Sequence, residues 1–119
     1  MHELSATRHI FEIVMAQAHL SEADSVDRIN LVIGDFSNIV PDCVNVYWKE
    51  LTKGSICENA EIHFDRRAVV FSCQQCQNTF ELQGKLSICP NCGSDQISFL
   101  SGDEMLVESI EITKFEENS

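Results

Sequence analysis

Cys73-Gln74-Gln75-Cys76 and Cys89-Pro90-Asn91-Cys92 form two C-x2-C pairs with twelve residues between them. Each pair can present two sulfur atoms to one side of an ion, and two such pairs complete a tetrahedral site. Zinc in a zinc ribbon is the natural occupant of such a site, and iron in a rubredoxin-like site is the main rival. The predicted metal ligands are Cys73, Cys76, Cys89 and Cys92.

Two other uses of paired cysteines fit the sequence less well. A redox-active C-x-x-C needs a thioredoxin-like βαβ context, whereas these pairs sit in a short polar stretch. Disulfide frameworks belong to oxidising compartments, and the chain shows no apolar signal peptide, so we expect it in a reducing cytoplasm. The two remaining cysteines, Cys43 and Cys57, are expected to be buried thiols that pack as small hydrophobic groups.

The chain begins Met1-His2-Glu3, and these three residues can form a chelate. The α-amine of Met1, the deprotonated amide of His2 and the His2 imidazole can close fused rings around one ion, and the Glu3 amide can supply a fourth nitrogen in the same plane. Four nitrogens in a plane suit nickel(II) or copper(II) rather than zinc. Taken alone, a histidine at the second position more often marks a disordered terminus. The hypothesis of a nickel or copper chelate therefore depends on the four-cysteine motif in the same chain.

Composition limits the class of protein. The 119 residues are 44% hydrophobic and 23% charged, with a formal net charge of −11, which is typical of a globular acidic domain. No apolar run approaches the length of a membrane span. Phosphates repel an acidic chain, so nucleic-acid binding is not expected, and a cation or a basic protein face fits better. The sequence contains no P-loop, G-x-S-x-G or H-E-x-x-H, and we expect no enzymatic activity.

Hydrophobic periodicity predicts two helices and two strands before the cysteines. Residues 3–20 carry an apolar stripe at helical spacing, and a second stripe begins after Pro41 and stops before Gly54. Alternation with period two predicts strands over residues 26–34 and 60–65. The order strand, helix, strand implies a parallel pair. The first stripe consists of Leu4, Ile10, Phe11, Val14, Met15 and Ala18.

The cysteine pairs lie in a segment that cannot fold alone. Residues 70–101 hold few apolar side chains, so a bound metal must supply much of their stability. Residues 105–115 then read as a last strand, which needs the sheet of the N-terminal half to join. We therefore predict an α/β fold with a small mixed three-stranded sheet and two helices, formed by residues 1–69 and 102–119. A four-cysteine zinc ribbon is inserted in it at residues 70–101.

Together, these features resemble the HypA family of nickel-incorporation proteins for hydrogenase and urease maturation. The resemblance covers nearly the whole chain, and the amino-terminal opening in combination with the cysteine pairs is specific to that family. The matching stretches are Met1-His2-Glu3-Leu4-Ser5, Ile33-Gly34-Asp35-Phe36-Ser37, residues 54–62, both cysteine pairs with Gly93-Ser94, and Ser109-Ile110-Glu111-Ile112.

The resemblance implies a metallochaperone with two kinds of metal. Nickel, the cargo, is expected at the amino terminus, with His2 as the key ligand, Met1 contributing its α-amine, and Glu3 acting as a ligand or a tuning neighbour. Structural zinc is expected on the four cysteines. Some family members carry an acidic residue in the turn after the first strand; here Ile39-Val40-Pro41 occupies that turn, so no further nickel ligand is assigned.

The resemblance also implies partners. They are the GTPase HypB, the hydrogenase large-subunit precursor and, for urease, its accessory proteins, with neither nucleic acid nor a membrane among them. A monomer and a homodimer both remain open. The alternative function is a zinc-ribbon scaffold that only binds proteins, with Met1-His2-Glu3 incidental. Nickel titration of a chain with a native amino terminus separates the two.

Overall fold

The computed structural model describes residues 2–82 and 88–115, with only the backbone for residue 2. The chain forms two compact units. The first comprises Met1–Val32, Ile39–Asp65 and Leu106–Ser119, and the second comprises Ile33–Asn38 and Arg66–Met105. Compactness describes packing rather than independent folding, so the predicted division into two domains stays a prediction.

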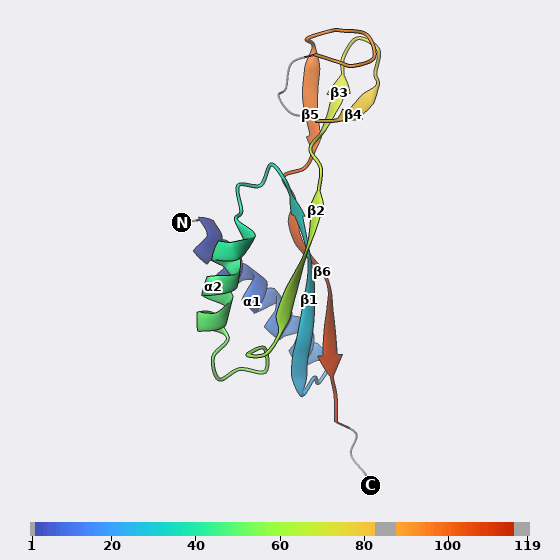
Figure 1. Cartoon of the computed structure of the whole chain (residues 1–119). Helices are drawn as coiled ribbons and strands as arrows, with labels where there is room; N and C mark the ends of the chain where they lie inside the picture. Colours follow the sequence, from blue (N-terminus) through green and yellow to red (C-terminus); the bar gives the residue numbers. More distant parts are fainter. Residues whose placement is uncertain (1, 83–87, 116–119) are drawn as a thin grey trace. The chain divides into compact units, whose positions relative to one another are not determined.

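Two helices and a three-stranded sheet account for most of the first unit. They are α1 (His2–Leu20), β1 (Ser25–Gly34), α2 (Pro41–Leu51), β2 (Glu61–Arg67) and β6 (Met105–Thr113). The strand order is β2-β1-β6. Strands β1 and β2 run in the same direction and β6 runs in the opposite one, with both helices on one face of the sheet (Figure 1). The predicted mixed sheet with two helices is therefore confirmed.

Helix α1 forms where the apolar stripe predicted it. Ile10, Val14 and Ala18 recur at helical spacing and are buried completely or almost completely, which places one face of the helix in the core. Thr7 is buried as well, although a polar residue gave no signal in the pattern. Its hydroxyl donates a hydrogen bond to the carbonyl of Glu3, so the burial of this polar group is compensated.

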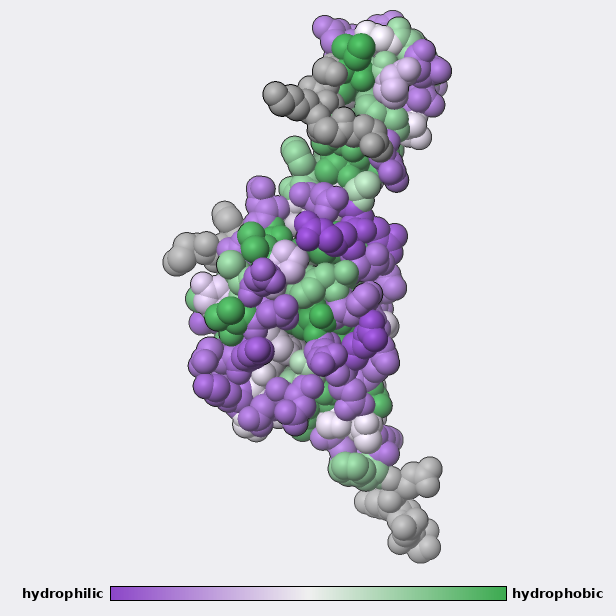
Figure 2. Space-filling model, viewed as in Figure 1, coloured by the Kyte–Doolittle hydropathy of each residue, from purple (hydrophilic) through white to green (hydrophobic). Residues whose placement is uncertain are grey.

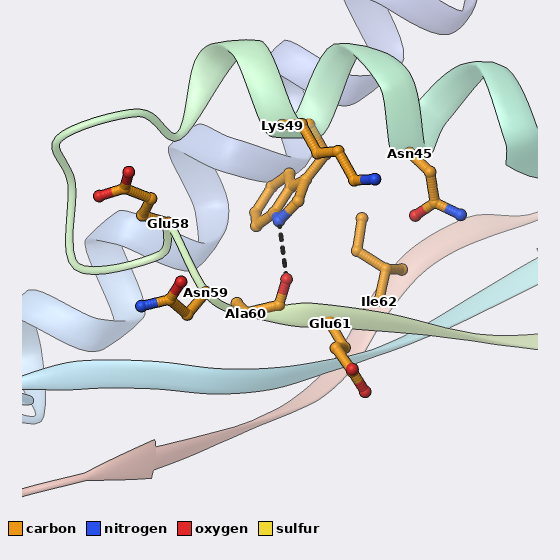
Figure 3. A pocket seen from close by; sticks show the side chains of 8 residues that line it. Asn45, Lys49, Glu58, Asn59, Ala60, Glu61 and Ile62 are labelled. Carbon is orange, nitrogen blue, oxygen red and sulfur yellow. Dashed lines mark hydrogen bonds between the residues drawn. The ribbon is translucent and has the colours of Figure 1, made fainter.

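Trp48 connects α2 to helix α1 and to the residue just before β2. Its ring meets Phe11 of α1 edge to face, with ring centroids 5.9 Å apart. Its indole N–H donates to the carbonyl of Ala60 at 3.3 Å, just before β2 begins (Figure 3). Helix α2 starts with Pro41 in its first turn, where the missing N–H costs nothing. It ends at Leu51, three residues before the predicted stop at Gly54.

A shallow groove of about 400 Å³ runs between α2 and the start of β2 (Figure 3). Its lining mixes carboxylates, amides and a lysine around the buried Trp48, and it includes no cysteine, histidine or serine. This set offers no soft metal ligand. The lining residues are Asn45, Trp48, Lys49, Glu58, Asn59, Ala60, Glu61 and Ile62.

The second unit contains the predicted ribbon. Its strands are β3 (Val70–Cys73), β4 (Thr79–Glu81) and β5 (Ile97–Ser101), in the antiparallel order β4-β3-β5. Its aromatic contacts centre on the buried Phe71, which meets Phe80 and Phe99 at centroid distances of 6.2 and 6.0 Å. The exposed Phe36 stacks on Phe99, which is also partly exposed, at 5.5 Å. Phe36 comes from the turn after β1, so this turn belongs to the ribbon unit.

None of the helices in the described part of the chain combines the length and apolar character that crossing a membrane requires. Hydrophilic residues cover most of the visible face of the first unit, with apolar residues scattered among them (Figure 2). This agrees with the net charge of −11.

Gly34 and Gly102 approach each other too closely for any larger residue. A Cβ on Gly34 would lie 2.0 Å from the carbonyl oxygen of Gly102, inside hard contact. The backbones are held there because Phe36 donates its N–H to that same oxygen at 2.7 Å. We expect Gly34→Ala to lower the free energy of unfolding by about 3 kcal/mol, the upper end for overpacking, as measured by urea denaturation with zinc present.

The control for this substitution is Gly54→Ala. Gly54 has a φ of +79°, but no neighbouring atom lies within 4 Å of the position that a Cβ would take, so only backbone strain of about 1 kcal/mol is expected. Equal losses at the two positions would show that the close approach of Gly34 and Gly102 does not determine stability.

Candidate metal centre

The fold brings the four predicted zinc ligands together. The sulfur atoms of Cys73, Cys76, Cys89 and Cys92 all lie within 4.8 Å of one another. Cys73 and Cys92 are 3.5 Å apart, and Cys76 and Cys89 are 3.7 Å apart. Zinc–sulfur bonds of about 2.3 Å in a tetrahedron require sulfur–sulfur distances of about 3.8 Å. The cluster therefore has the dimensions of a tetrathiolate metal site.

The two cysteine pairs adopt the same local conformation. In each, the residue after the second cysteine has a positive φ, 62° at Gln77 and 78° at Gly93. In each, that residue donates its N–H to the carbonyl of the first cysteine, at 2.9 Å in both pairs. The first cysteine in turn donates to the carbonyl five residues ahead, at 2.9 Å for Cys73 and 2.8 Å for Cys89. This double turn explains why two intervening residues suffice to point both sulfurs to one side.

The electrostatics of the cluster call for a cation. The side-chain amide of Asn91 donates to Cys76 at 3.4 Å and, as the largest cause, lowers the pKa of this thiol to about 6. For Cys92, the Ser94 amide acts to lower the pKa, but the nearby sulfur of Cys73 and burial raise it to about 12. Four thiolates at this spacing repel one another unless a metal ion neutralises them. Thiolate ligands favour zinc or iron over hard cations.

The predicted nickel ligands are described only in part. Met1 and the side chain of His2 lie outside the described residues, so the structure does not test the amine and the imidazole. Glu3 is described: its carboxylate accepts the N–H of Val40 at 3.3 Å. The pKa of this carboxyl is lowered, first by its own backbone N–H and also by that of Val40. Glu3 is thereby attached to the loop that leads into α2.

The two cysteines outside the cluster differ from each other. Cys57 is completely buried, as predicted, with its sulfur 3.6 Å from that of Met15. Cys43, predicted to be buried, is exposed, and that prediction was wrong. The buried residues of α2 are Val44 and Trp48, four apart on one face, so the position next to Val44 turns away from the core.

This difference predicts which thiols react. Burial raises the pKa of Cys57 to about 11, so at a pH of about 8 this thiol stays protonated and shielded, and thiols react as thiolates. In zinc-loaded protein we expect iodoacetamide to label Cys43 alone, as followed by mass spectrometry. Chelation should expose the four cluster cysteines, and Cys57 should react only after unfolding. Rapid labelling of Cys57 in the folded protein would contradict its placement in the core.

Asn91 contacts the cluster, and the sequence pattern did not reveal this contact. It lies between the third and fourth cysteines, and its side chain contacts a sulfur of the other pair. The only signal in the sequence was an amide side chain inside a C-x2-C pair, which does not by itself predict a cross-contact.

Comparison with known proteins identifies relatives along nearly the whole chain. A family model described as "Hydrogenase/urease nickel incorporation, metallochaperone, hypA" matches residues 1–112. A hydrogenase maturation factor HypA of Dehalococcoides mccartyi strain CBDB1 is 36% identical over 112 residues, which cover 94% of each chain. The HypA of Caldanaerobacter subterraneus subsp. tengcongensis is 33% identical over 113 residues, covering 94% of this chain and 99% of the relative.

Solved structures show the same fold. The solution structure of the nickel metallochaperone HypA from Helicobacter pylori superposes with a TM-score of 0.67 at 20% identity, covering 93% of this chain and 97% of that one. A second solution structure of a HypA protein gives a TM-score of 0.71 at 22% identity, covering 94% and 96%.

Proposed function

Since the chain belongs to the HypA family of hydrogenase and urease nickel-incorporation metallochaperones, we propose that it binds Ni(II) at its amino terminus and delivers the ion during maturation of a nickel–iron hydrogenase. The proposed ligands are the α-amine of Met1, the amide and imidazole nitrogens of His2, and the amide nitrogen of Glu3. The observation that carries the proposal is that α1 begins at His2 and that two hydrogen bonds hold Glu3 in place. The carbonyl of Glu3 accepts the Thr7 hydroxyl, and its carboxylate accepts the Val40 N–H.

The start of a helix suits this chelate for two reasons. The first N–H groups of a helix have no acceptor within the helix, so the amides of His2 and Glu3 can lose their protons without breaking a helical hydrogen bond. The two deprotonated amides balance the two positive charges of Ni(II), so the complex is neutral. The positive end of the helix dipole therefore does not repel it. An isolated cation at the same place would be repelled.

The contacts of Glu3 support a particular role for this residue. Its carbonyl accepts the buried Thr7 hydroxyl, and its carboxylate accepts the Val40 N–H. A carboxylate already held by the loop before α2 is less available to a metal than the amide. We therefore assign the amide as the nickel ligand and the carboxylate as the tether that keeps the helix start in place.

Zinc is the proposed resident metal of the four-cysteine cluster. The ligands would be Cys73, Cys76, Cys89 and Cys92, whose spacing and thiolate chemistry fit the ion. Four protein ligands leave no position for water, so the ion supplies stability to the ribbon rather than catalysis. In keeping with a maturation factor, no turnover is proposed for the chain.

The proposed partners follow from the family and the charge. An acidic chain with a net charge of −11 docks most readily on a basic protein face, with an association rate that falls as salt rises. The GTPase HypB and a hydrogenase large-subunit precursor are the proposed partners, and the urease accessory proteins are the corresponding ones for urease. The cytoplasm, where thiols stay reduced, is the proposed compartment.

A delivery experiment in cells tests the proposal. We expect cells that lack the protein to lose hydrogenase activity and to regain part of it with excess nickel. The His2→Ala protein should fail to restore activity at low nickel. A matched control is His19→Ala, which changes an exposed histidine at the other end of α1 and should restore activity fully. Full restoration by His2→Ala would favour the scaffold alternative, in which the zinc ribbon binds partners without nickel transfer.

A further inference from the structure

Asn91 contacts sulfur atoms from both cysteine pairs. Its backbone N–H donates to Cys89 Sγ, the first cysteine of its own pair, at 3.4 Å. Its side-chain amide reaches across to Cys76 Sγ, the second cysteine of the other pair, also at 3.4 Å. Cys76 lies at the surface, whereas Cys89 is buried. One residue thus connects the inner and the outer part of the cluster.

The corresponding residue of the first pair behaves differently. Gln75 occupies the position that Asn91 has in the second pair, and its backbone N–H is one of the groups that lower the pKa of Cys73. Within the described residues, however, no hydrogen bond joins the Gln75 side chain to a sulfur. The pseudo-symmetry of the two turns therefore holds for the main chain and breaks at the side chains, so the Asn91–Cys76 contact is not a by-product of the turn.

We propose that Asn91 is a positioning residue of the zinc site, whose side-chain amide orients Cys76 Sγ toward the metal and slows the loss of the ion from the exposed side of the cluster. A dipole that donates to a thiolate offsets part of the excess negative charge of a tetrathiolate site. The longer Gln75 side chain does not substitute for it, because it makes no such contact. The inference rests on the proposed four-cysteine zinc site and is independent of nickel binding.

The effect expected is that of losing an outer-sphere partner. Substitution of such partners typically reduces metal affinity by about 10- to 100-fold. Because Cys76 is a surface ligand, this loss should appear mainly as faster release of zinc rather than as failure to bind it. The protein should still carry one zinc per chain as purified.

Three variants of the full chain separate the effect of the hydrogen-bond donor from the effect of side-chain size. Asn91→Ala removes the amide, Asn91→Asp keeps the size but replaces the donor by a negatively charged acceptor, and Gln75→Ala is the matched control. Zinc transfer to a chromogenic chelator is followed for each. We expect roughly tenfold faster transfer for Asn91→Ala, at least as fast a transfer for Asn91→Asp, and a change of less than about twofold for Gln75→Ala.

A spectroscopic readout distinguishes positioning from general loosening. Cobalt(II) replaces zinc in each protein, and the energy of the sulfur-to-cobalt charge-transfer band reports the electron density on the sulfurs. The band should shift in both Asn91 variants and stay unchanged in Gln75→Ala. The inference is overturned if Asn91→Ala releases zinc at the wild-type rate, if Asn91→Asp behaves as wild type, or if Gln75→Ala matches the Asn91 variants. If the wild-type protein binds no zinc, the four-cysteine site itself fails instead.

Discussion

Replacing Cys76 by serine is expected to abolish stable zinc binding and to unfold the ribbon while leaving both helices intact. Structural zinc in small domains contributes about 10–16 kcal/mol of apparent binding energy. The ribbon has few other sources of stability, since its apolar contacts are mainly those of Phe71 with Phe80 and Phe99. Serine offers no thiolate, so an incomplete tetrahedron remains.

The first unit should survive this change. Its core residues, such as Ile10, Val14 and Leu31, are buried independently of the cysteine cluster. We therefore expect zinc content by elemental analysis to fall from one per chain to near zero, with the helical circular dichroism almost unchanged. Amide resonances of the ribbon should collapse toward unfolded positions.

Cys43→Ser provides the control for this experiment. Cys43 is exposed and lies outside the cluster, so its loss should alter neither zinc content nor fold. A Cys76→Ser protein that keeps one tightly bound zinc and a folded ribbon would contradict a structural role for the metal. Purified protein that carries iron in the site would favour the rubredoxin-like alternative.

Removing the imidazole of His2 is expected to cause the second largest effect, on nickel binding rather than on the fold. The loss of a direct ligand should exceed what an outer-sphere partner contributes, so we expect His2→Ala to weaken nickel binding by at least about 100-fold. An extra residue placed before Met1 should do the same, because it converts the ligating amine into an amide. Isothermal titration with nickel measures both.

The pH dependence of nickel binding has a defined sign. Each proposed ligand must lose a proton before it binds the ion. Nickel occupancy should therefore fall as the pH falls. Zinc content and thermal stability should be unchanged in His2→Ala, and His19→Ala should bind nickel as the native protein does. Native-like affinity in the extended chain would exclude the amine as a ligand.

The parts of the fold that the sequence predicted are those specified by short-range patterns. A helical period places Ile10, Val14 and Ala18 on one face regardless of what the helix packs against, and α1 is found where that period predicted it. Alternation likewise predicted β1 and β2, and chain order implied their parallel arrangement. The four cysteines were identifiable because two intervening residues close the turn that points both sulfurs to one side.

The sequence did not predict the burial or the contacts of residues whose surroundings come from distant parts of the chain. Cys43 was expected in the core, yet it lies one position away from the buried Val44, a displacement of about 100° around a helix. Phe36 was visible only as part of a turn, although it stacks on Phe99 in the ribbon. A residue type and its spacing cannot report which distant group covers it.

The sequence by itself thus determined the two helices, the parallel pairing of β1 and β2, the four-cysteine cluster and the hypothesis of an amino-terminal chelate, because each follows from local patterns and spacings in the chain. Only the tertiary structure decided that Glu3 is tethered to Val40, that Gly34 must be glycine beside Gly102, and that Asn91 reaches Cys76. These contacts join residues between 15 and 68 positions apart, as the residue numbers show. At such separations no periodicity constrains the distance between two groups, and only the packing of the whole chain brings them together.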